Sequence, residues 1–149
     1  MAHPLREAVK QHFYPFAESK GFDRAKSSHP HFTTFRRIGP DIVHVFDVQW
    51  DKYGRPKFVI NFAEAESGPS PDAIETQDCK VLRRLQPNKR SPRWWRLRKP
   101  WSEILRTGRL RYTPKEVVDQ VIATFSEAEA WWSEKIEGPH VRVLWRRAG

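Results

Sequence analysis

The first apolar positions of the chain recur at the three- and four-residue spacing of an amphipathic helix. The residues on the shared face are Leu5, Ala8, Val9, His12, Phe13 and Phe16. Pro15 interrupts this pattern, because a proline inside a helix removes the backbone hydrogen bond to Gln11 and costs about 3 kcal/mol. We therefore expect a helix with a kink or break near Phe13, ended by Gly21 in the left-handed conformation.

After this helix the apolar spacing changes to two, which is typical of β-strands. Residues 32–38, 42–50 and 57–63 are rich in aromatic and β-branched side chains. The short turns between them predict antiparallel neighbours. The side chains expected on the core face of the second and third strands are Ile42, His44, Phe46, Val48, Trp50, Phe58, Ile60 and Phe62. Valines on the reverse face predict partial cover there as well.

The second half of the chain predicts further strands and one long helix. Residues 79–85 fit a strand better than a short helix, while residues 94–98 and 140–147 allow a short strand and an edge strand. Thr113 and Glu116 match a capping box, with a proline in the first turn, at the start of the helix. Its apolar stripe is Val117, Val118, Val121, Ile122, Phe125, Ala128 and Trp132.

These elements together predict one α+β domain that takes in all 149 residues. We expect an antiparallel sheet of about four to five strands, a meander, packed with an N-terminal and a C-terminal helix. The single cysteine excludes an intrachain disulfide and favours a reducing compartment, so we expect a cytoplasmic protein. The N-terminus lacks an export signal, and no apolar run approaches the about 18 residues of a membrane span. We therefore expect no contact with a membrane.

The order of the predicted elements is also similar to that of a known bacterial family. The residues that carry the similarity are Lys20-Gly21-Phe22 at the end of the first helix, Val48-Gln49-Trp50, Phe58–Phe62 and the later Trp-Trp pairs. In this order they resemble the family called domain of unknown function 4304, best over residues 5–64 and more loosely over residues 79–95. The resemblance implies a small antiparallel sheet flanked by helices. It implies no chemistry, because that family has no established activity or catalytic residues.

Positive charge is concentrated in one stretch of the chain. Residues 80–111 hold twelve Lys and Arg against one acid, whereas the rest of the chain holds fifteen basic and seventeen acidic residues. This concentration predicts an electropositive surface for an acidic or phosphate-bearing partner. The residues expected to form it are Arg83, Arg84, Lys89, Arg90, Arg93, Trp94, Trp95, Arg96, Arg98 and Lys99. Alternatively the stretch is solvated and its tryptophans belong to the core. Neighbouring positions on a strand face opposite sides of the sheet, so at most one of Trp94 and Trp95 is expected in the main core.

Other residue types point to chemistry less directly. His29 and His31 offer two nearby imidazoles, but zinc normally takes three or four ligands, so we expect loop histidines and no metal site. The isolated glycines form no phosphate-binding loop, and we expect no cofactor. An enzyme site would require His44, Asp47 and Cys79 to meet in one cleft.

Three functions are compatible with these observations. We expect a non-catalytic binding module that engages an acidic protein partner through the basic, tryptophan-bearing surface. The first alternative is a nucleic-acid-binding protein that uses the same residues. The second alternative is an enzyme of unknown reaction with a cleft near His44, Asp47 and Cys79.

Overall fold

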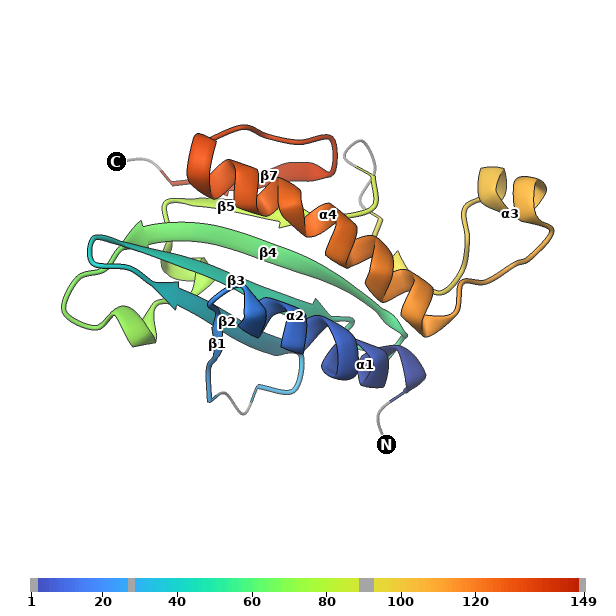
Figure 1. Ribbon diagram of the computed structural model, residues 1–149, viewed down its shortest axis with the longest axis horizontal. Helices are drawn as coiled ribbons and strands as arrows, with labels where there is room; N and C mark the ends of the chain where they lie inside the picture. Colours follow the sequence, from blue (N-terminus) through green and yellow to red (C-terminus); the bar gives the residue numbers. More distant parts are fainter. Residues whose placement is uncertain (1–2, 27–28, 89–92, 148–149) are drawn as a thin grey trace.

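Two helical segments, one at each end of the chain, pack on the same face of an antiparallel sheet (Figure 1). The computed structural model describes residues 3–26, 29–88 and 93–147. The strands are β1 (Asp23–Arg24), β2 (Phe32–Ile38), β3 (Ile42–Trp50), β4 (Lys57–Glu66), β5 (Val81–Leu85), β6 (Trp95–Arg96) and β7 (Val141–Arg146). Their order is β1-β2-β3-β4-β5-β7, and β6 pairs with the beginning of β4. The expected α+β class is confirmed; β6 corresponds to the short strand allowed at residues 94–98, and β1 is a two-residue strand that was not expected.

The N-terminal helical segment accommodates Pro15 by changing its helix type. It consists of α1 (Pro4–Ala8), the π-helical turn η1 (Val9–Phe13) and α2 (Tyr14–Ser19). The wider π-helical turn ends immediately before α2, so Pro15 lies in the first turn of α2, where its missing N–H is tolerated. The irregularity expected near Phe13 is thus confirmed. Gly21 then adopts φ 91°, the left-handed conformation expected at the end of the segment.

The C-terminal helix α4 (Pro114–Glu134) begins with the predicted capping box. The Thr113 side chain accepts from the backbone N–H of Glu116, and the Glu116 carboxylate accepts from the backbone N–H of Thr113. Three shorter helices were not expected from the periodicity: η2 (Pro71–Ala73), η3 (Thr76–Asp78) and α3 (Trp101–Thr107).

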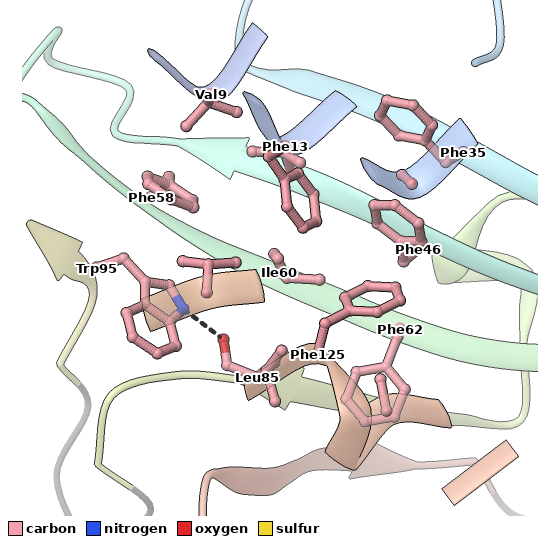
Figure 2. Packing of buried hydrophobic residues seen from close by; sticks show 14 of the residues in the cluster. Val9, Phe13, Phe35, Phe46, Phe58, Ile60, Phe62, Leu85, Trp95 and Phe125 are labelled. Atoms are coloured by element: carbon pink, nitrogen blue, oxygen red, sulfur yellow. Dashed lines mark hydrogen bonds between the residues drawn. The ribbon is translucent and has the colours of Figure 1, made fainter. Parts of the chain in front are cut away.

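The main core lies between the helices and the sheet and is dominated by phenylalanine (Figure 2). Phe13, Phe46 and Phe125 come from the N-terminal segment, β3 and α4, and their ring centroids lie 5.2–5.9 Å apart at steep angles. Such edge-to-face pairs contribute about 1 kcal/mol each beyond the area that they bury. The helices are therefore held to the sheet by shape-specific contacts.

The reverse face of the sheet is only partly covered. A small cluster of Val45, Ala63, Cys79 and Leu82 is buried there beneath Ile74, Leu144 and Trp145. The partial cover expected from the reverse-face valines is confirmed. We call this side of the sheet the open face, because no α-helix packs on it in the described part of the chain (Figure 1).

Candidate binding surface

Residues 97–112 form an arm that projects beyond the sheet and the start of α4, at the right of Figure 1. Its two limbs pair as a narrow ribbon, because the Lys99 N–H donates to the Leu110 carbonyl at 3.0 Å and the Tyr112 N–H donates to the Leu97 carbonyl at 2.7 Å. The helix α3 closes the ribbon and ends at Gly108, which has φ 72°. We call residues 97–112 the arm.

The arm exposes large apolar side chains. Trp101, Leu105 and Leu110 have exposed fractions of 72%, 80% and 64%, and α3 contains no buried residue. A helix this short is unstable by itself in water. Covering exposed apolar side chains of this size with a partner lowers the free energy of the system. The arm therefore has the character of an interaction element.

Basic side chains surround the place where the arm meets the sheet. Two adjoining hollows of about 310 and 480 Å³ lie there and share Arg96 and Arg98. We call them together the basic groove, whose charged residues are Arg55, Lys57, Arg93, Arg96, Arg98 and Arg111. No Asp or Glu lines either hollow in the described part of the chain. The groove is thus a local concentration of positive charge with apolar side chains, Leu97 and Leu110, in its wall.

The groove forms because strands that lie far apart in the sequence pair in the sheet. Lys57 at the start of β4 lies directly opposite Arg96 of β6. Across the arm, the backbones of Arg98 and Arg111 form an antiparallel β-bridge. Arg93, Arg96 and Arg98 were expected here from the sequence, whereas Arg55 and Lys57 lie outside the basic stretch and were not. No local signal identifies those two, because only the β4–β6 pairing places them beside it.

Some cations of the basic groove and of residues 80–111 are matched by carboxylates. Arg55 pairs with Asp51 at 3.0 Å, and its hydrogen bonds lower the pKa of that carboxyl to about 2. On the arm and at the start of α4, Arg106 pairs with Glu103 and Arg109 pairs with Glu116. Lys57, Arg93, Arg96, Arg98 and Arg111 form no ion pair with any described carboxylate. These five carry the unmatched charge of the groove.

Arg83 and Arg84 point to opposite faces of β5, which corrects the expectation that they share one surface. Arg83 is buried on the helix side, where its guanidinium lies 4.0 Å from the centre of the Trp131 ring and pairs with Glu137 at 3.0 Å. Burial lowers the pKa of Arg83, and the hydrogen bond that Arg83 donates to the Glu137 carboxylate opposes that change. Arg83 is therefore a structural residue.

The adjacent tryptophans also divide between the faces, as expected. Trp95 is buried in the main core, and its indole N–H donates to the Leu85 carbonyl at 3.3 Å (Figure 2). Trp94 is half-buried at the rim of the groove, with the charged ends of Lys57 and Arg84 within 5.5 and 5.7 Å of its ring centre. Of these two tryptophans, Trp94 is the one available to a partner.

Lys99 is a second correction to the expected surface. It is buried at the base of the arm, where its ammonium group donates to the Thr107 hydroxyl at 2.8 Å and lies 5.2 Å from the centre of the Tyr112 ring. It fixes the arm instead of facing a partner. The expected residues Lys89 and Arg90 lie outside the described residues.

A buried polar network occupies the open face beside β5. The Asp47 carboxylate accepts from the Thr76 hydroxyl and from the Asn61 side-chain amide, the latter at 2.7 Å. Arg84 donates through Nε to Asn61 Oδ1 at 2.9 Å and through Nη2 to Gln49 Oε1 at 3.1 Å. Burial raises the pKa of Asp47 to about 6, against the opposing effect of its hydrogen bonds.

The residues of the expected enzyme cleft do not meet. His44 lies on the helix side of β3 and stacks on Trp132, with ring centroids 5.0 Å apart, whereas Asp47 and Cys79 lie on the open face. Cys79 is buried, and this burial raises its pKa to about 11, so its thiolate is scarce near neutral pH. The geometry removes the basis for a site that uses all three.

Metal chemistry finds no support among the residues that the structure describes. The rings of His29 and His31 lie with centroids 5.8 Å apart. No group of three or more His, Cys, Asp or Glu side chains within residues 3–26, 29–88 and 93–147 is placed to hold an ion.

Comparisons of the chain with protein-family models, with curated proteins and with solved structures found no match. The resemblance to domain of unknown function 4304 therefore stays a prediction. Among the described helices, none combines the length and the apolar character that crossing a bilayer requires.

Proposed function

We propose that this protein is a binding module that engages an acidic protein partner through the basic groove and the arm. The observation that supports this most directly is the position of five unmatched cations beside the exposed apolar side chains of the arm. Acidic side chains of a partner would pair with Lys57, Arg96 and Arg98. Its apolar side chains would cover Trp101 and Leu105.

The apolar part of the surface favours a protein over a nucleic acid. Protein interfaces combine a central apolar patch with a polar rim, whereas nucleic-acid interfaces are more polar and more strongly charged. Trp101, Leu105 and Leu110 extend the charged groove with such a patch. A phosphate backbone would leave most of that apolar surface uncovered.

One observation favours nucleic acid as a second candidate. Trp94 is half-buried and flanked by Lys57 and Arg84, an arrangement on which a base could stack. About five phosphate contacts would then give a log–log dependence of affinity on salt with a slope near −4. Fluorescence anisotropy with labelled single-stranded DNA and RNA measures that slope, and a lack of retention at low salt removes this candidate.

Affinity capture from the native cell extract tests the proposed function. The bait variant carries Arg96→Gln, Arg98→Gln and Arg111→Gln, which removes three unmatched charges of the groove. The control variant carries Lys10→Gln, Arg24→Gln and Lys26→Gln, which removes the same charge from exposed positions outside the groove. We expect an acidic protein to be retained by the wild type and the control after nuclease treatment, and lost from the groove variant.

Two results would contradict the proposal. Loss of all captured material after nuclease treatment would identify a nucleic acid as the ligand. Equal retention of the same protein by the groove variant and the wild type would show that the groove does not hold it. Circular dichroism and the unfolding midpoint of each variant verify that the fold is intact.

A further inference from the structure

A third hollow lies on the open face of the sheet. It has a volume of about 370 Å³ and is bounded by η3 on one side and β7 on the other. Its floor holds Asp47, Gln49, Asn61 and Arg84, and one wall holds Leu144 and Trp145. We call it the trough. Neither hollow of the basic groove shares a lining residue with it.

Arg84 places a positive charge on the floor of the trough, and no described carboxylate forms an ion pair with it. Its guanidinium is half-buried and donates to two uncharged acceptors, Asn61 Oδ1 and Gln49 Oε1. Asp47 attracts it from a distance, but the Asp47 oxygens accept from Thr76 and Asn61 instead. Arg142 lies directly across the β5–β7 pair and adds to the positive potential. A partly desolvated cation in this position gains stability from an anion.

Hydrogen-bond donors are in surplus around the trough. The Asn61 amide N–H groups are used on Asp47 and Gln49, and the Asn61 oxygen is used by Arg84. Beyond these two hydrogen bonds, the Arg84 guanidinium lies 5.7 Å from the centre of the Trp94 ring and has further N–H groups that a ligand could use. Arg147 at the rim lies 4.7 Å from the centre of the Trp145 ring and provides more donors. A complementary ligand therefore presents acceptors.

We propose that the trough binds a small organic anion, with its carboxylate or phosphate group on Arg84 and its apolar or aromatic portion against Leu144 and Trp145. The two-point hold of Asn61 and Gln49 on the guanidinium fixes its plane before the ligand arrives, which lowers the entropy cost of binding. The indole face and the leucine provide the apolar wall. The trough adjoins the groove through the contact between Arg84 and Trp94, but it contains none of the five unmatched cations of the groove.

Titration of ¹⁵N-labelled protein with phenyl phosphate, benzoate and inorganic phosphate tests this assignment by NMR. Phenyl phosphate or benzoate is expected to shift the Arg84 Nε–H and Trp145 indole signals in a saturable manner. Arg84→Gln is expected to weaken the binding at least tenfold, and Arg84→Lys to weaken it less, because charge remains without the fixed plane. Arg24→Gln, which removes one exposed positive charge from β1, is the matched control and should leave the affinity unchanged.

The results that support the site differ from those that would overturn it. Saturable binding that Arg84→Gln abolishes and Arg24→Gln preserves supports the site. Equal affinity of Arg84→Gln and wild type for each probe would overturn it, and so would shifts that never saturate. Equal affinity for inorganic phosphate and phenyl phosphate would overturn the organic character of the ligand. If Arg84→Gln does not fold, Arg84→Lys with an affinity equal to that of the wild type would still overturn the role of the fixed guanidinium.

Discussion

At the scale of single residues, Asp47 is the carboxylate whose surroundings differ most from water. Burial raises its pKa from the ordinary 3.8 to about 6, although Thr76 and Asn61 both donate to it and Arg84 attracts its charge. The folded state therefore holds a proton on Asp47 more tightly than the unfolded state does. It follows that the free energy of unfolding falls as the pH rises through this range.

Asp47→Asn should remove this pH dependence. Between about pH 5 and about pH 7.5 we expect the wild type to lose about 1 kcal/mol of stability through Asp47. The amide of the variant is neutral at both pH values and can keep partners in Thr76 and Asn61. Urea unfolding of both proteins at the two pH values measures the difference.

The comparison is designed to cancel other titrations. Burial and Arg37 lower the pKa of His44, which makes stability rise with pH in both proteins. The difference between wild type and Asp47→Asn isolates the carboxyl group. A pH dependence that is the same in both proteins would contradict the burial of an ionisable Asp47.

Arg83 and Arg84 show how far the position of a side chain could be predicted from the sequence. Strand alternation separates Trp94 from Trp95, and the same rule separates Arg83 from Arg84 once residues 81–85 are taken as a strand. The concentration of charge along the chain predicts one basic surface, but the alternation of side chains along the strand divides that charge between two faces. The partners Glu137 and Asn61 that decide the roles of the two arginines come from distant parts of the chain.

At the scale of elements, local signals predicted the regular parts of the fold well. Apolar periodicity identified the strands β2, β3 and β4, and cap residues identified the start of α4. The helix α3 was missed because it has no buried residue and so no apolar face directed at the core. The pairing of Lys57 with Arg96, which creates the groove, could not be predicted because neither residue carries a signal for the other.

Thr113→Ala should test the start of α4. The side chain of Thr113 accepts from the Glu116 N–H, and loss of this cap is expected to lower the free energy of unfolding by about 1 kcal/mol. Ser126→Ala is the control, because Ser126 is exposed within the same helix and alanine there favours the helix slightly. Denaturant unfolding measures both. Equal destabilisation by the two substitutions would contradict a specific role for the cap.

At the scale of the whole molecule, the surplus charge falls on separate surfaces. The helix side of the sheet uses Arg83 within the fold, the end of the sheet near the arm carries the basic groove, and the open face carries the trough. The arm, which projects beyond the sheet (Figure 1), places the exposed side chains of Trp101, Leu105 and Leu110 next to the groove. This arrangement supports a macromolecular partner at the arm and a small anion at the trough.

Photo-crosslinking from the tip of the arm tests the central claim most directly. A benzoylphenylalanine in place of Leu105 lies on the exposed face of α3, and the same group in place of exposed Ile38 on β2 is the control. We expect the Leu105 derivative to form a covalent adduct with an acidic protein in the native cell extract. Arg96→Gln together with Arg98→Gln should suppress this adduct, and the Ile38 derivative should not form it. An adduct with nucleic acid, or the same protein adduct from both positions, would contradict the central claim.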